Sequence, residues 1–121
     1  TLKSVHIGNN KCWESFYFEN ECDINSRRLL PQNRNTSLQV LSIKGNTELS
    51  SQLPQQFCLF SQLNTLKIYD NPKLYGGIPD CFRYLTNLQY LDLHSNSFSG
   101  VFPDLSELSL NTILLHNNSF S

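Results

Sequence analysis

Residues 85–103 read Leu-Thr-Asn-Leu-Gln-Tyr-Leu-Asp-Leu-His-Ser-Asn-Ser-Phe-Ser-Gly-Val-Phe-Pro. Apolar residues stand at Leu88, Leu91 and Leu93, and Asn96 follows three positions later. The same spacing recurs in four other segments, Leu2-Val5-Ile7-Asn10, Leu38-Leu41-Ile43-Asn46, Leu63-Leu66-Ile68-Asn71 and Leu110-Ile113-Leu115-Asn118. Successive Asn residues are 36, 25, 25 and 22 positions apart. A period near 25 predicts a solenoid, in which each coil buries its apolar residues only against neighbouring coils.

Each repeat reads as a short strand followed by a turn. The alternation of Leu91 and Leu93 indicates a strand with one buried face. The amide of Asn96 can donate and accept, so stacked copies predict an Asn ladder along the solenoid. Gly100 suits a backbone of positive φ, and Pro103 ends ladder pairing where the chain turns away. An amphipathic helix is excluded, because apolar steps of three and two do not follow a period of 3.6.

Residues 96–103, Asn-Ser-Phe-Ser-Gly-Val-Phe-Pro, and residues 71–79, Asn-Pro-Lys-Leu-Tyr-Gly-Gly-Ile-Pro, extend the repeat. They resemble the leucine-rich repeat family, and specifically its plant-type extracellular subclass with the pattern LxxLxLxxNxLSGxIP. The resemblance implies a leucine-rich repeat solenoid, α/β by convention, formed as a right-handed coil. We expect five short parallel strands on the concave face and a mostly irregular or 3-10 convex side, within one domain spanning residues 1–121.

Two intervals depart from the period. The segment between Asn10 and Asn46 is eleven residues longer than the usual 25. We interpret residues 11–30 as an insertion closed by a disulfide between Cys12 and Cys22. The last interval is three residues short, which predicts an abbreviated convex turn. Both ends lack a segment that resembles a cap, so the chain is expected to be a piece of a longer protein or to have its ends covered by other chains.

The four cysteines suggest two disulfides and an oxidising compartment. Cys58 and Cys81 follow Leu53-Pro54 and Ile78-Pro79 at similar offsets, so they lie on the convex side of adjacent coils. Coils stack about 4.8 Å apart, which is within disulfide reach. We therefore predict a Cys58–Cys81 pair, with free buried thiols as the alternative. A zinc site is disfavoured, because no CxxC pair exists.

Composition excludes several classes of function. The net charge is −1 and basic residues are scattered, so neither nucleic acid nor an anionic membrane is an expected partner. No apolar stretch is long enough for membrane insertion. No nucleophile and oriented base occur together in a pattern that indicates an enzyme, so we expect no catalytic residues and no cofactor.

The residues between the core positions predict the composition of the concave face. In strand order they form the columns His6, Ser42, Lys67, Asp92 and Leu114; Gly8, Lys44, Tyr69, His94 and His116; and Asn9, Gly45, Asp70, Ser95 and Asn117. The candidate ligand-binding residues are Lys67, Tyr69, Asp70, Asp92, His94 and His116. The alternative is a solvated sheet face without a ligand. His94 and His116 share a column but lack the further ligands of a metal site, so we expect no metal.

Sequons at Asn35 and Asn117 predict N-linked glycans on a secreted protein. These features favour an extracellular or cell-surface, non-catalytic module that recognises a protein, peptide or carbohydrate. One alternative is a structural glycoprotein whose coils stack end to end into an extracellular fibre. Another is an inhibitor of a secreted hydrolase, an activity that the resemblance includes.

Overall fold

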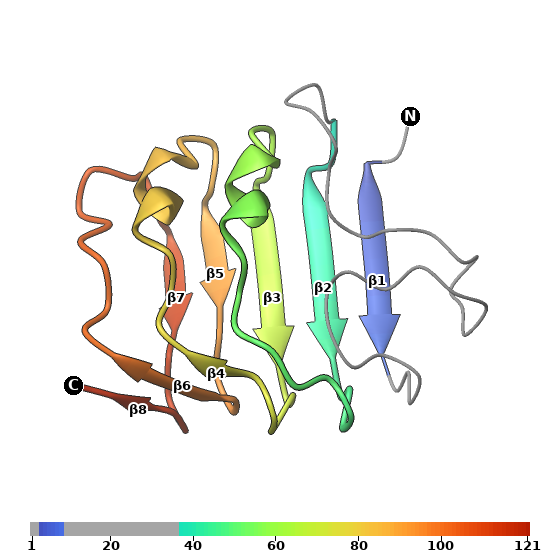
Figure 1. Cartoon of the computed structure of the whole chain (residues 1–121). Helices are drawn as coiled ribbons and strands as arrows, with labels where there is room; N and C mark the ends of the chain where they lie inside the picture. Colours follow the sequence, from blue (N-terminus) through green and yellow to red (C-terminus); the bar gives the residue numbers. More distant parts are fainter. Residues whose placement is uncertain (1–2, 9–36) are drawn as a thin grey trace.

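The computed structural model describes residues 3–8 and 37–121. Five parallel strands form one sheet in the order β1-β2-β3-β5-β7 (Figure 1). Their bounds are β1 Ser4–Gly8, β2 Val40–Lys44, β3 Thr65–Tyr69, β5 Tyr90–Asp92 and β7 Thr112–Leu114. Each predicted repeat contributes one of these strands, so the predicted leucine-rich repeat solenoid is confirmed.

The strands pair in the register of the repeat. Leu41 pairs with Leu66 and Leu66 with Leu91, and all three side chains are fully buried. Because parallel coils superpose equivalent residues, one apolar position per coil builds a continuous column of the core. Ile113 occupies the same column in β7 but is 45% exposed. Among the described strands it has a neighbour on one side only, which explains its exposure.

Within the described residues, the opposite side of the coils holds two 3-10 helices and a second small sheet. The helices are η1 (Gln55–Leu59) and η2 (Asp80–Tyr84), consistent with the predicted 3-10 character of this side. The second sheet has the order β4-β6-β8 (Figure 1), with bounds β4 Tyr75–Gly76, β6 Ser97–Gly100 and β8 Ser119–Phe120. The sequence did not predict this sheet, because its strands have two to four residues and no apolar alternation of their own.

After β2, β3, β5 and β7, a left-handed residue stands directly before the ladder Asn. These residues are Gly45, Asp70, Ser95 and Asn117, with φ between 57° and 65°. Asp and Asn tolerate this region better than other residues with a Cβ, and Gly adopts it without a steric penalty. The positive φ predicted for Gly100 is also present, at 81°. In these four coils the predicted third column of the concave face is therefore a row of turn residues rather than of strand residues, and its first member, Asn9, lies outside the described residues.

The Asn ladder connects adjacent coils. The side-chain amide of Asn71 donates to the carbonyls of Ile43 (3.1 Å) and Tyr69 (2.9 Å), and its Oδ1 accepts from the backbone N–H of Asn46 at 3.1 Å. Asn96 repeats this pattern one coil later, accepting from the N–H of Asn71 at 3.0 Å. Buried backbone groups in each turn thus find partners in the next coil. Asn10 lies outside the described residues.

Asn118 belongs to the ladder, but one of its hydrogen-bond partners differs from those of Asn71 and Asn96. Its amide donates to the carbonyls of Leu93 at 2.7 Å and Leu115 at 3.1 Å, as the pattern requires. Its Oδ1, however, accepts from the N–H of Phe98 at 3.0 Å instead of from Asn96. The shortened interval between Asn96 and Asn118 accompanies this change of acceptor partner.

A disulfide joins Cys58 in η1 to Cys81 in η2, with Cα atoms 6.0 Å apart. This is the pair that the repeat register predicted. It links two adjacent coils on the side away from the five-stranded sheet. The proposed insertion at 11–30, its Cys12–Cys22 pair and the sequon at Asn35 lie outside the described residues.

Candidate recognition surface

The outward face of the five-stranded sheet, here called the strand face, carries a stack of three aromatic rings. Tyr69 stacks on His94 with ring centroids 4.8 Å apart and planes 14° apart. His94 stacks on His116 at 4.6 Å and 13°. The three residues belong to successive coils, and strands lie roughly 4.8 Å apart in a sheet. The coil spacing therefore sets the ring spacing, and the sequence column Tyr69-His94-His116 becomes a continuous stack.

Asp92 fixes the central ring of this stack. Its Oδ1 accepts from the backbone N–H of His94 at 3.1 Å and also binds the Nδ1 of the same imidazole. With Nδ1 held by the carboxylate, Nε2 is the ring nitrogen that remains for a ligand. The Asp92 carboxylate thus orients His94 within the stack.

Asp92 itself is only 4% exposed, although the sequence placed it among the ligand-contacting residues. Lys67 and Leu114 flank it on the neighbouring strands. Because its own face of the sheet is covered by these neighbours and by His94, it presents almost no surface. In the structure it supports the site rather than lining it.

The other predicted members of the surface lie around the stack. Lys67 is partly exposed, and its Nζ lies 5.1 Å from the centroid of the Tyr90 ring in a cation–π contact. Lys44 precedes Tyr69 in the same column. Asp70 is exposed in the left-handed turn position, at the end of β3. The structure therefore brings Lys67, Tyr69, His94 and His116 onto one surface and leaves Asp70 at its edge.

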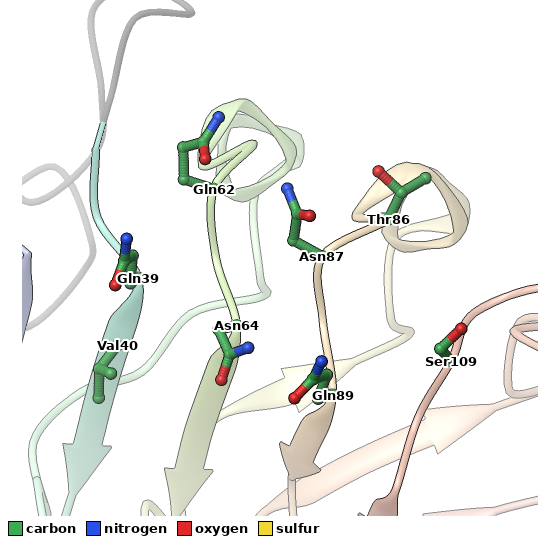
Figure 2. A pocket seen from close by; sticks show the side chains of 8 residues that line it. All are labelled: Gln39, Val40, Gln62, Asn64, Thr86, Asn87, Gln89 and Ser109. Carbon is green, nitrogen blue, oxygen red and sulfur yellow. The ribbon is translucent and has the colours of Figure 1, made fainter.

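A groove that the sequence did not predict lies at the start of the strands (Figure 2). It has a volume of about 420 Å³ and is lined by Gln39, Val40, Gln62, Asn64, Thr86, Asn87, Gln89 and Ser109. We call it the amide groove, since five of these residues carry a primary amide. The sequence did contain a signal: Gln39, Asn64 and Gln89 recur every 25 residues, directly before or at the start of a strand. The predicted columns of the concave face begin after the second apolar residue of each repeat and therefore do not include these three positions.

A second hollow, of about 410 Å³, includes Arg83 and Tyr84 at the end of η2 together with Asp104 and Glu107. Arg83 donates to the hydroxyl of Tyr84 at 3.1 Å, and this bond raises the pKa of the guanidinium. Hydrogen bonds from Ser106 lower the pKa of Asp104, including a 3.0 Å bond from the Ser106 backbone N–H. Arg83, Tyr84 and Asp104 are exposed and line the same hollow.

The sequon residue Asn117 is exposed, and its amide donates to the Ser95 hydroxyl at 3.3 Å. It lies beside His116 and so borders the strand face. Within residues 3–8 and 37–121, no group of three or more His, Cys, Asp or Glu side chains is arranged to hold a metal ion. No helix in this described part is long and apolar enough to cross a membrane.

Comparisons with known proteins agree with the repeat. Residues 87–108 match the family model described as Leucine Rich Repeat. A chain in the crystal structure of the BIR3–SERK2 complex from Arabidopsis thaliana is 34% identical, with a TM-score of 0.65. That match covers 70% of this chain and 46% of the other. No curated protein matches the sequence.

The crystal structure of a plant ice-binding protein is also similar, with 28% identity and a TM-score of 0.62. It is matched over 69% of this chain and 27% of its own length. The chain thus spans less than half the length of either similar structure. The matched repeat at 87–108, the parallel sheet and these two similarities identify the fold as a leucine-rich repeat solenoid.

Proposed function

We propose that this protein is a non-catalytic extracellular recognition module that binds a protein partner through its strand face. The observation that carries the proposal is the Tyr69-His94-His116 stack. Aromatic side chains give a large contact area for little lost conformational freedom. Stacking and the Asp92 contact restrict these rings further, so less entropy is lost when a partner binds.

The chemistry of the surrounding surface fits a partner with mixed polar and apolar contacts. Lys44 and Lys67 supply positive charge on one side of the stack, and Asp70 supplies negative charge at the turn. Interfaces between proteins commonly combine aromatic anchors at the centre with charged residues at the rim. Tyr69, His94 and His116 are the proposed contacts, Lys67 and Asp70 the proposed rim, and Asp92 the residue that positions His94.

The comparisons support protein binding and a place outside the cell. One similar chain comes from a structure of a complex between two proteins. Both similar structures are from plants, which supports the plant-type extracellular subclass proposed from residues 71–79 and 96–103. The Cys58–Cys81 disulfide supports an oxidising compartment.

The test is quantitative binding to a panel of purified secreted proteins and receptor ectodomains from the source organism. For any partner of the wild-type protein, Tyr69→Ala and His116→Ala should each raise the dissociation constant about tenfold or more, as expected for residues of an interface hot spot. Tyr84→Ala is the matched control, because Tyr84 is 65% exposed but lies in η2, away from the strand face. It should leave the dissociation constant unchanged.

Two outcomes would contradict the proposal. In one, Tyr84→Ala weakens binding while Tyr69→Ala and His116→Ala do not, which would move the interface to the η2 side. In the other, no member of the panel binds the wild-type protein at micromolar concentration. Circular dichroism and melting curves of each variant establish that a loss of binding is not a loss of fold.

A further inference from the structure

The amide groove is separate from the aromatic stack and has its own chemistry. Its lining side chains begin or precede the strands, whereas Tyr69 and His94 lie at or beyond the strand ends. All eight described lining residues are uncharged, and seven of them carry an amide or a hydroxyl. The described lining offers no counter-ion to a charged ligand, and Val40 is the one apolar side chain that could contact an apolar ligand. The lining therefore selects for a neutral ligand that is rich in hydrogen-bonding groups.

Much of the hydrogen-bonding capacity of the groove is unused. Within the described residues, the Asn64 Oδ1 accepts from the Thr65 hydroxyl at 3.1 Å, and the Asn87 amide donates to the Ser61 carbonyl at 3.1 Å. The side-chain amides of Gln39, Gln62 and Gln89 make no hydrogen bond with the described part of the chain. Each amide offers two donor hydrogens and an acceptor oxygen. The groove thus presents donors and acceptors together, as hydroxyl groups require.

These amides repeat at the spacing of the coils. The backbone N–H of Asn64 donates to the Gln39 carbonyl at 2.8 Å, and the N–H of Gln89 donates to the Asn64 carbonyl at 2.8 Å. Figure 2 shows the three side chains as one row across the strand starts, with Gln62 and Asn87 in a second row beside them. Adjacent members of a row are therefore one coil, roughly 4.8 Å, apart. From Gln39 to Ser109 the groove crosses four coils, or about 14 Å.

We propose that the amide groove binds a neutral oligosaccharide that lies across the strands. Sugar hydroxyls both donate and accept, which matches primary amides. A chain of identical sugar units presents the same hydroxyls at regular intervals, which matches two rows of repeated amides. An extended peptide fits less well, because the lining provides no apolar pockets for alternate side chains. The proposal goes beyond protein binding at the strand face and does not depend on it.

The test uses the ¹⁵N-labelled protein and three neutral probes, cellohexaose, xylohexaose and chitohexaose, with a hexamer of galacturonic acid as the charged comparison. At least one neutral probe should shift the side-chain NH₂ signals of Gln39, Gln62 and Gln89 in a saturable titration. The charged hexamer should shift them less at the same concentration, because the groove has no cation to offset its carboxylates.

Variants assign the binding to the groove. Gln89→Ala should raise the dissociation constant of the neutral probe about fivefold, the loss expected for one net hydrogen bond. The double variant Gln62→Ala and Gln89→Ala should raise it further. Gln56→Ala is the matched control, since Gln56 is an exposed amide in η1 outside the groove. His116→Ala should also leave the dissociation constant of the sugar unchanged, which separates this site from the aromatic stack.

The proposal is overturned if none of the neutral probes shifts the groove amides at millimolar concentration. Stronger binding of the galacturonic acid hexamer would overturn it as well, because that result requires a charged site. If a neutral probe binds but Gln89→Ala and Gln56→Ala behave alike, the sugar binds elsewhere on the protein. None of these results affects the test with Tyr69→Ala and His116→Ala.

Discussion

The buried carboxylate of Asp92 binds the imidazole Nδ1 of His94, two residues away on the same face of the sheet. The same carboxylate oxygen accepts the backbone N–H of His94 at 3.1 Å. This double contact holds one ring of the Tyr69-His94-His116 stack in a defined orientation. It couples a residue that no ligand can reach to the surface that we propose for binding.

Replacing His94 by Ala should therefore affect stability as well as binding. His94→Ala removes the side-chain partner of the buried Asp92 carboxylate but keeps the backbone N–H bond, so we expect a loss of about 1 kcal/mol, the net worth of one hydrogen bond. His116→Ala removes only an exposed ring and should change the free energy of unfolding by less than about 0.5 kcal/mol. Urea unfolding of both variants measures the difference. Equal, small losses would show that the Asp92–His94 contact contributes little to stability.

The Asn ladder predicts a strong effect of a small substitution. Asn96→Ala removes an amide that donates to the Ile68 carbonyl at 2.7 Å and to the Leu93 carbonyl at 2.8 Å, and an oxygen that accepts from Asn71. We expect a loss of about 1–3 kcal/mol in unfolding free energy, since these backbone groups become unpaired. Asn111→Ala, at an exposed position, is the control. An unchanged melting temperature of Asn96→Ala would contradict a stabilising ladder.

The Cys58–Cys81 disulfide closes a loop with a sequence separation of 23 residues. Its removal in the double variant Cys58→Ser and Cys81→Ser should lower the unfolding free energy by about 2–4 kcal/mol, because the unfolded chain gains freedom. Chemical denaturation measures this, and non-reducing peptide mapping identifies the pairs in the wild-type protein. A map that joins Cys58 or Cys81 to another cysteine would contradict the structure. The Cys12–Cys22 pair stays a prediction that the same map tests.

The Asp104 carboxyl should titrate below its ordinary pKa of 3.8, since hydrogen bonds from Ser106 stabilise its charged form. A folded-state pKa below the unfolded value means that the contribution to stability is complete above the unfolded pKa and is lost as the pH falls through the folded pKa. Ser106→Ala retains the backbone bond but removes the hydroxyl, so the pKa should rise toward 3.8. NMR titration of the Asp104 side chain measures both values. A pKa that does not respond to Ser106→Ala would assign the shift to the backbone bond alone.

Asn117 is exposed at the edge of the strand face, so a secretory host should attach a glycan there. Intact mass before and after enzymatic removal of N-glycans tests occupancy, and Ser119→Ala, which destroys the sequon, is the control. If Asn117 is occupied, removal of the glycan should strengthen binding at neighbouring His116, because the sugar covers part of that surface. An unmodified Asn117 in the secreted protein would contradict this prediction. The sequon at Asn35 is tested in the same spectrum.

The sequence by itself determined the features that repeat with the coil. The spacing of Leu88, Leu91, Leu93 and Asn96 placed the inner strands and the Asn ladder, and the register of adjacent coils predicted the Cys58–Cys81 disulfide. These features follow from periodicity, because equivalent residues of parallel coils must lie next to one another.

Only the tertiary structure decided what the side chains between the core positions do. The burial of Asp92 depends on Lys67 and Leu114 from neighbouring strands, and the sequence column alone did not show that His94 would cover it. The amide groove and the second sheet likewise arise where short segments of several coils meet. The repeat sets which residues are neighbours, but the shape and exposure of a surface depend on how side chains from several coils fill the space between them.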